Sequence, residues 1–207
     1  MDLNKYDLYV FDVDGTLYFQ PKLRKIMVCR LVKYYMTHLN RIYDLLIIKE
    51  FRDIREKAES ANNLYEATAE KLKVSADRVE EVIKKWIYEN PLDAVRESRD
   101  IELLDIIGRL QKAGKTVAIW SDYAADDKLS ALGLDIEYVY TAEDERVGEL
   151  KPSPKGLNLI MSDLSIPKDK VLMVGDREVK DGAAAIAAGV DSLILSKKPA
   201  ERHLQLI

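Results

Sequence analysis

Five short apolar runs along the chain have the pattern of buried β-strands. Each is rich in β-branched and aromatic side chains and is bounded by polar or turn-forming residues. The runs are Tyr6–Val13, Thr116–Trp120, Glu137–Thr141, Val171–Val174 and Ser192–Leu195. Continuous apolar runs of this kind are typical of strands that are covered on both faces, so we expect a mostly parallel, buried sheet.

Helical patterns separate the last four runs. Apolar side chains recur at helical spacing over 101–110, with Ser98 as the predicted N-cap and Gly114 as the stop. Further helices are predicted over Lys128–Leu132, from Ser153-Pro154 to about Leu164, and over Asp181–Ala188. Strands that alternate with helices indicate an α/β fold, a Rossmann-like parallel sheet with helices on both faces.

A long stretch from about Leu17 to Glu97 has no strand pattern. Two apolar stripes at helical spacing run through it, the second with Ser75 as a predicted N-cap. The stripes are Leu31, Val32, Tyr35, Leu39, Ile42, Tyr43 and Leu46, and Val79, Val82, Ile83, Trp86 and Ile87. We therefore predict an all-helical domain of residues 17–97, inserted into an α/β domain of residues 1–16 and 98–207.

Composition narrows the classes of protein that the chain can belong to. Its 207 residues hold 32 Lys and Arg against 36 Asp and Glu, so it lacks the basic surplus of a dedicated nucleic-acid binder. No apolar stretch approaches the ~18 residues of a membrane span. The first residues have no signal-peptide pattern, and Cys29 alone can form no internal disulfide. We expect a cytoplasmic protein without membrane or nucleic-acid partners, and a buried Cys29 within its helical apolar pattern.

A small basic cluster stands near the start of the helical stretch. It consists of Lys22, Arg24, Lys25 and Arg30. Such a cluster is commonly a solvated face or hinge. The alternative is that one of its members contacts an anionic group of a substrate.

Polar side chains gather where the predicted strands end. They are Asp12, Asp14, Gly15 and Thr16 after the first strand, Ser121 after the second, Lys151 after the third, and Gly175, Asp176 and Asp181 after the fourth. Ligands of open parallel sheets bind beyond the carboxyl ends of the strands, so these segments should meet at one place.

The chemistry of this group points to a phosphoryl group. Crowded carboxylates such as Asp12 and Asp176 need a cation, and carboxylate oxygens suit Mg²⁺. Lys151 and the Ser121 hydroxyl can bind anionic oxygens, and Gly15 lets backbone N–H groups approach an anion closely. An aspartate carboxylate can itself act as a nucleophile and form an aspartyl-phosphate. Asp14, where the chain bends, could serve as acid and base.

At this point the sequence resembles the haloacid dehalogenase-like hydrolase superfamily, and we identify it as a member on four motifs in the family's order. The motifs are Asp12-Val13-Asp14-Gly15-Thr16-Leu17, Ser121 after Thr116–Trp120, Lys151 in Leu150-Lys151-Pro152, and Gly175-Asp176 with Asp181. The first motif departs from some branches. Phosphoglycolate phosphatases and sugar-phosphate mutases often carry Asp-Ser shortly after it, whereas this chain has Leu17-Tyr18-Phe19-Gln20.

The resemblance implies a role for each motif residue. Asp12 would be the nucleophile, and Asp14 would protonate the leaving oxygen and then activate water. Residues predicted to contact the phosphate are Gly15, Thr16, Ser121, Asp122 and Lys151. Asp122 stands where relatives frequently have Asn, so it adds negative charge there unless it points away. Asp12, Asp14 through its backbone carbonyl, and Asp176 would bind Mg²⁺, with Asp181 supporting the metal or Lys151. The helical insertion would be the family's cap.

The predicted function is that of a magnesium-dependent phosphatase that hydrolyses a small phosphorylated metabolite through an aspartyl-phosphate, as a monomer or small homo-oligomer. The alternatives are a phosphosugar mutase on the same fold and a non-catalytic protein that binds phosphate and Mg²⁺. A dehalogenase is disfavoured because family dehalogenases usually lack the second aspartate, present here as Asp14. The sequence does not name the substrate.

Overall fold

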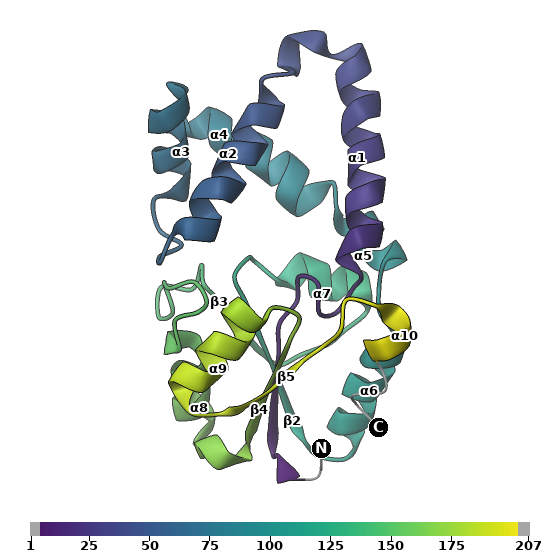
Figure 1. Ribbon diagram of the computed structural model, residues 1–207, viewed down its shortest axis with the longest axis vertical. Helices are drawn as coiled ribbons and strands as arrows, with labels where there is room; N and C mark the ends of the chain where they lie inside the picture. Colours follow the sequence, from purple (N-terminus) through teal and green to yellow (C-terminus); the bar gives the residue numbers. More distant parts are fainter. Residues whose placement is uncertain (1–4, 203–207) are drawn as a thin grey trace.

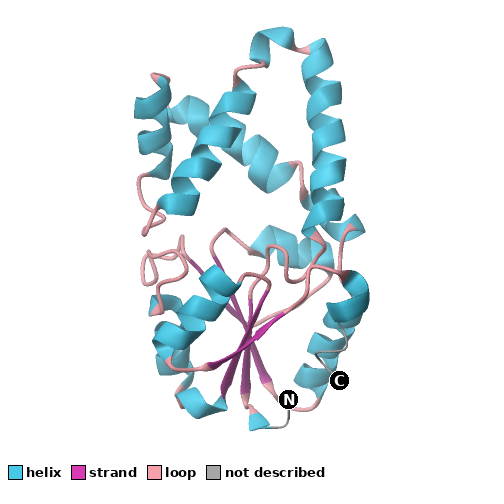
Figure 2. Ribbon diagram, in the orientation of Figure 1, coloured by secondary structure: helices cyan, strands magenta, loops and turns pink. Residues whose placement is uncertain are grey.

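Five parallel strands form the centre of the computed structural model, which describes residues 5–202 (Figures 1 and 2). The strands are β1 Leu8–Phe11, β2 Thr116–Ser121, β3 Tyr138–Thr141, β4 Val171–Gly175 and β5 Asp191–Ile194. Their order is β3-β2-β1-β4-β5, and every neighbouring pair is parallel. All five predicted strands and the α/β fold class are thus confirmed. The chain's first four residues, where no signal pattern is expected, lie outside the described range.

The two faces of the sheet pack against different helices because successive side chains point to opposite sides. Tyr9 and Phe11 face the cluster that includes α6 and α7. Leu8 and Val10 face the cluster that includes α8 and α9. The helices of this part of the chain are α6 Ile101–Lys112, α7 Asp126–Leu132, α8 Lys155–Leu164, α9 Ala183–Ala188 and α10 Pro199–Arg202, with a short 3₁₀ turn at Lys168–Lys170. The sheet is therefore covered on both faces, as predicted.

The ends of two of these helices differ from the sequence-based expectation. Helix α6 is capped by Asp100, whose carboxylate accepts a hydrogen bond of 3.1 Å from the backbone N–H of Leu103. Ser98, the predicted N-cap, instead follows the end of the preceding helix. The predicted helix over 181–188 is divided into a π-helical turn, Glu178–Gly182, and α9.

Every secondary-structure element within residues 20–97 is a helix or helical turn, and these elements stand over the carboxyl end of the sheet in Figure 1. The elements are α1 Gln20–Thr37, a 3₁₀ turn at Leu39–Arg41, α2 Asp44–Lys57, α3 Leu64–Leu72, α4 Ala76–Ile83, a π-helical turn at Lys84–Glu89, and α5 Leu92–Glu97. The stripe from Val79 to Ile87 is buried in a core that this region forms by itself, and Ser75 caps α4 as predicted. This separate core supports a separate domain, although its boundaries at 17 and 97 stay a prediction.

The prediction that the stripe from Leu31 to Leu46 forms one buried helical face is wrong. The chain bends after Thr37 and begins α2 at Asp44, so the helical phase is not kept across the turn. Only Tyr35 of this stripe is buried, and Leu39 is 69% exposed. Cys29 is also exposed, contrary to expectation. No helix within 5–202 is long and apolar enough to cross a membrane.

Candidate active site

The predicted site residues come together at the carboxyl end of the sheet. Asp12 directly follows β1, Ser121 is the last residue of β2, and Asp176 directly follows β4. Asp181 lies in the π-helical turn after β4, and Lys151 lies in the loop between β3 and α8. Because β1, β2 and β4 are adjacent in the sheet, segments that are up to 170 residues apart in the chain become neighbours.

Lys151 links two of the carboxylates. Its Nζ atom donates hydrogen bonds to Asp12 Oδ1 at 2.6 Å and to Asp181 Oδ1 at 2.7 Å. The Lys151 side chain is only 2% exposed, and its ammonium lies 5.1 Å from the centroid of the Trp120 ring. Burial acts to lower the pKa of Lys151, but the charges of Asp12 and Asp181 outweigh it and raise that pKa. Lys151 therefore stays a fixed positive charge in this site.

Three carboxylates form a cluster that fits a hard cation. One oxygen from each of Asp12, Asp176 and Asp181 lies within 4.8 Å of the others. Burial raises the pKa of Asp12, with Lys151 acting against it, and burial likewise raises the pKa of Asp176. Asp176 Oδ1 is buried without a hydrogen-bond partner among the described residues. An unpaired acceptor beside two more carboxylates is the donor set that Mg²⁺ prefers.

Two glycines make room for these carboxylates. Gly15 has a φ of +99°, which side-chain-bearing residues rarely adopt, and a Cβ atom there would lie 2.5 Å from Asp176 Oδ2. A Cβ atom at Gly175 would collide with the Asp181 side chain. The motif glycines are thus needed for the close approach of the acidic side chains, a reason that the sequence alone does not show.

Asp14 has a different set of partners from Asp12. Lys128 Nζ donates to both oxygens of the Asp14 carboxylate, at 2.7 and 2.8 Å, and the Tyr18 hydroxyl donates to Oδ1. Burial alone would raise the pKa of Asp14, but the charge and hydrogen bonds of Lys128 hold that pKa below its ordinary value. Sequence reasoning missed both partners. Lys128 lies in α7, a short helix that packs on the sheet face of Tyr9 and Phe11. No motif or spacing in the sequence connects Lys128 with Asp14.

The remaining motif residues hold the site together. Thr16 Oγ1 donates to Asp12 Oδ2 at 2.9 Å, so the Asp12 carboxylate is fixed by Thr16 on one oxygen and Lys151 on the other. The Ser121 hydroxyl accepts from the backbone N–H of Tyr123 at 3.2 Å. Asp122 accepts from the backbone N–H of Lys151 at 2.9 Å and so anchors the lysine loop. The phosphate contacts of Gly15, Thr16, Ser121, Asp122 and Lys151 stay predictions.

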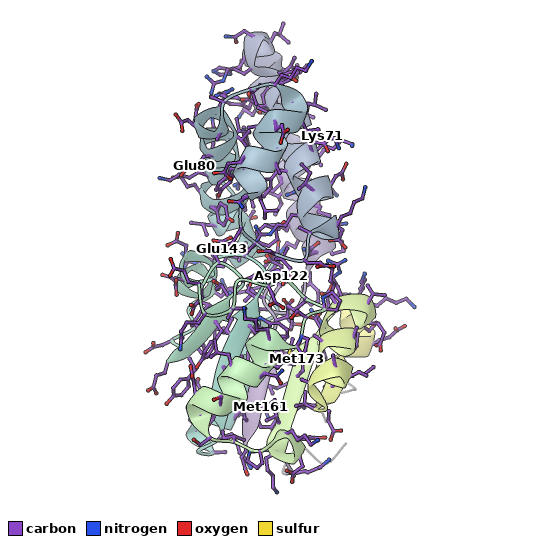
Figure 3. The ribbon with its side chains drawn as sticks, turned by 90° about the vertical axis from the view of Figure 1, so that its left-hand side faces the viewer. Lys71, Glu80, Asp122, Glu143, Met161 and Met173 are labelled. Atoms are coloured by element: carbon purple, nitrogen blue, oxygen red, sulfur yellow. The ribbon has the colours of Figure 1, made fainter. Side chains whose placement is uncertain are left out.

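An arginine from the helical region reaches the same edge of the sheet. Arg55 of α2 is 5% exposed and donates to the backbone carbonyl of Asp122 and, at 3.3 Å, to Glu143 Oε1. Its guanidinium lies 4.0 Å from the centroid of the Tyr123 ring. Figure 3 shows Asp122 and Glu143 at the level where the helices meet the sheet domain. Arg55 carried no motif signal in the sequence.

Comparisons with known proteins agree with this fold. The model of a hydrolase family described as haloacid dehalogenase-like hydrolase matches residues 6–189. A comparison with curated proteins finds no match. Among solved structures, a 2-haloacid dehalogenase from Pseudomonas syringae is 17% identical, with a TM-score of 0.63 over 92% of this chain and 86% of that one.

Two further structures show the same fold. The HAD-hydrolase YfnB from Bacillus subtilis, described as bound to magnesium, is 16% identical, with a TM-score of 0.61 over 92% of this chain and 89% of its own. A protein from Haemophilus somnus described as a predicted phosphoglycolate phosphatase is 16% identical, with a TM-score of 0.62 over 94% and 87%. These neighbours include both dehalogenase and phosphatase descriptions, so the chemistry has to be argued from the site.

Proposed function

Because the chain belongs to the haloacid dehalogenase-like hydrolase family, whose model spans residues 6–189, we propose that it is a magnesium-dependent phosphatase. Its substrate would be a small phosphorylated metabolite and its intermediate an aspartyl-phosphate on Asp12. The proposed protein is a cytoplasmic monomer or small homo-oligomer that needs no nucleic-acid or membrane partner.

One observation carries this proposal more than any other. Lys151 lies between Asp12 and Asp181, and Asp176 completes a three-carboxylate cluster whose oxygens are within 4.8 Å of one another. With Lys151 on one side of Asp12 and a bound cation on the other, two positive charges would face the group that Asp12 attacks. Such an arrangement favours a doubly negative group, such as a phosphoryl group. Asp12, Asp176 and the backbone carbonyl of Asp14 would hold Mg²⁺, which when bound would neutralise charge on the phosphoryl oxygens.

The proposed reaction has two steps. In the first, a carboxylate oxygen of Asp12 forms a bond to phosphorus, the bond from phosphorus to the leaving oxygen breaks, and Asp14 gives that oxygen a proton. In the second, Asp14 takes a proton from water, the water oxygen bonds to phosphorus, and the Asp12 carboxylate is released. Thr16 and Lys151 orient Asp12 throughout, since they hold its two oxygens.

Asp14 favours phosphoryl transfer over dehalogenation. A halide leaving group needs no proton, whereas an alkoxide leaving group does. The chain places a second, half-buried carboxylate two residues after the nucleophile and gives it dedicated partners in Lys128 and Tyr18. A mutase would use the same two carboxylates, so it is kept as an alternative, as is a protein that only binds phosphate and Mg²⁺.

The proposal is tested by hydrolysis of p-nitrophenyl phosphate with and without Mg²⁺, for the unaltered protein, Asp12→Asn and Asp169→Asn. Asp169 is an exposed acid at the opposite end of the sheet and serves as the matched control. We expect magnesium-dependent turnover that is lost in Asp12→Asn and retained in Asp169→Asn. Turnover that survives in Asp12→Asn, or chloride release from 2-chloropropionate without any phosphatase activity, would refute the proposal.

A further inference from the structure

A small cavity opens beside Asp176, where the chain enters α1. It has a volume of about 70 Å³, and its lining includes Gly15 and Phe19. Since one water needs roughly 10–15 Å³ of such space, the cavity has room for several waters or for one tetrahedral oxyanion. Gly15 and Asp176 also belong to the proposed active site, whereas the other residues of the lining have no role in the proposed phosphatase mechanism.

Three cations, one from α1 and two from the last described residues, converge on this cavity. Arg24 comes from α1, Lys197 follows β5, and Arg202 comes from α10. Arg24 and Lys197 are exposed, and neither forms a hydrogen bond or ion pair with another described residue. The charge of Lys197 acts on Asp176, whose pKa burial raises and Lys197 lowers, but no hydrogen bond fixes either cationic side chain, so both can reach an anion in the cavity.

The third cation is buried and partly unsatisfied. Arg202 is 1% exposed, donates to Asp100 Oδ2 at 3.1 Å and donates to the carbonyl oxygen of Gly15 at 2.5 Å. Its Nε atom is buried and has no partner among the described residues. A buried N–H group without an acceptor is unfavourable, and water or a ligand in the cavity can supply that acceptor.

The charge around the cavity is positive on balance. Asp176 is the one acidic residue in its lining. No Asp or Glu occurs between Gly15 and Tyr43, so α1 adds only positive charge. Even if Asp176 and Asp100 each neutralise one cation, positive charge remains. Arginine in such a setting favours planar or tetrahedral oxyanions, which accept two of its N–H groups at once.

We propose that this cavity is an oxyanion site in which Arg24, Lys197 and Arg202 bind a carboxylate or phosphate group. This proposal favours one of the two interpretations of the basic cluster at the start of α1, namely that one of its members contacts an anionic group rather than only solvent. Arg30 forms an ion pair with Asp93 and Lys22 contacts a backbone carbonyl, whereas Arg24 lines the cavity. The anion is either a second anionic group of the substrate or a free inorganic anion, and only the first of these assignments rests on the proposed phosphatase function.

The site itself is tested with selenate, which needs no catalysis. Its affinity is measured by calorimetry, and its position by anomalous diffraction from crystals that contain it. The variants are Arg24→Ala and Lys197→Ala, and the controls are the neighbouring cations Lys25→Ala and Lys198→Ala, which do not line the cavity. We expect selenate in the cavity and an affinity about tenfold lower in each variant, or ~1.4 kcal/mol, because a charged hydrogen bond is lost. The controls should match the unaltered protein.

Two results would overturn the proposal. One is selenate that binds only between Ser121 and Lys151, or not at all. The other is an unchanged affinity in both variants, which would mean that the cations serve only to balance the charge of Asp176.

The source of the anion is tested with a matched pair of substrates, phenyl phosphate and 4-carboxyphenyl phosphate. If the site takes a substrate group, Arg24→Ala lowers kcat/KM for the carboxylated ester more than for the plain one, and Lys25→Ala leaves the ratio unchanged. If it takes a free anion, selenate binding is lost while the ratio stays at its original value. If the protein hydrolyses neither ester, the proposed function fails, but the selenate measurements still decide whether the site exists.

Discussion

The two aspartates of the first motif lie two residues apart and have opposite electrostatic surroundings. Asp12 shares Lys151 with Asp181, and burial raises its pKa. Asp14 has Lys128 to itself, and its pKa is lowered. The lowered pKa keeps the Asp14 carboxylate ionised, which is the form that takes a proton from water in the second step. The partners of Asp14 therefore decide the pH range in which it can act as a base.

Replacing Lys128 should change the pH dependence of the reaction. In Lys128→Met, burial is opposed only by the Tyr18 hydrogen bond and the charge of Lys151, so the pKa of Asp14 rises. The second step needs ionised Asp14, so the acid limb of kcat for p-nitrophenyl phosphate should move to higher pH. At low pH the loss is bounded by the ~10²–10⁴-fold contribution of general acid–base catalysis. Lys128→Arg keeps the charge and should keep the original profile. Superimposable profiles for Lys128→Met and the unaltered protein would contradict this role.

The motif residues could be predicted from the sequence, whereas their partners could not. Asp12, Asp14, Lys151 and Asp176 each directly follow a strand or stand in a short motif, so parallel topology is enough to bring them together. Lys128 contacts Asp14 across 114 positions of the chain, through the packing of α7 on the sheet. Neither residue spacing nor composition predicts a contact that depends on how a helix packs against the sheet.

At the scale of elements, the start of α6 connects the helical region, the first motif and the end of the chain. Asp100 caps α6 through Oδ1 and pairs with the buried Arg202 through Oδ2. Its backbone N–H also donates to the carbonyl of Leu17 at 3.0 Å. Ser98, two residues earlier, has a buried hydroxyl without a partner among the described residues. The two residues therefore make a matched pair for a stability measurement.

Asp100→Ala should destabilise the protein far more than Ser98→Ala. Loss of the cap removes ~1 kcal/mol, and leaving Arg202 buried without its carboxylate removes a further ~3–5 kcal/mol. Ser98→Ala removes an unsatisfied hydroxyl and should change the free energy of unfolding by less than about 1 kcal/mol. Urea denaturation of both variants measures the difference. A larger effect at Ser98 would show that the cap lies where the sequence pattern first indicated.

Helix ends and long stripes were the least predictable elements. Both Ser98 and Asp100 are good N-cap residues, but Ser98 is the C-cap of α5, and Asp100 makes both the capping hydrogen bond and the ion pair with Arg202. The apolar positions from Leu31 to Leu46 fit one helix on paper, but the chain turns at Leu39–Arg41. A helical period predicts a shared face only while the helix continues. The stripe from Val79 to Ile87 is buried as predicted, because α4 continues directly into the π-helical turn Lys84–Glu89 without a bend to a new helix.

At the scale of the whole molecule, the helical region is joined to the sheet domain by polar contacts around Arg55. Arg55 and Tyr88 both donate to Glu143, the latter at 2.6 Å. Glu56, the next residue of α2, forms an ion pair with Arg177, which directly follows Asp176. These contacts connect the helices to the loops that carry Lys151 and Asp176. Polar contacts of this kind can break and reform, as closure over a site requires.

Removing Arg55 should therefore loosen the helical region without unfolding it. Its buried, charged hydrogen bonds contribute ~1.5–3 kcal/mol each, so Arg55→Ala should raise the population of open conformers about tenfold or more. Cys29 is the chain's single cysteine and is exposed on α1, so one spin label can be attached there and a second at Lys168→Cys. Double electron–electron resonance then measures the distance between the helical region and the sheet domain. We expect a broader distribution with longer distances in Arg55→Ala.

Lys49→Ala, which removes an exposed pair within α2, should leave the distribution unchanged. Because α2 packs through Ile47 and Phe51 rather than Arg55, circular dichroism should show the same helix content in all three proteins. An unaltered distance distribution in Arg55→Ala would then mean that the remaining contacts, such as the Glu56–Arg177 ion pair, hold the two domains together without Arg55.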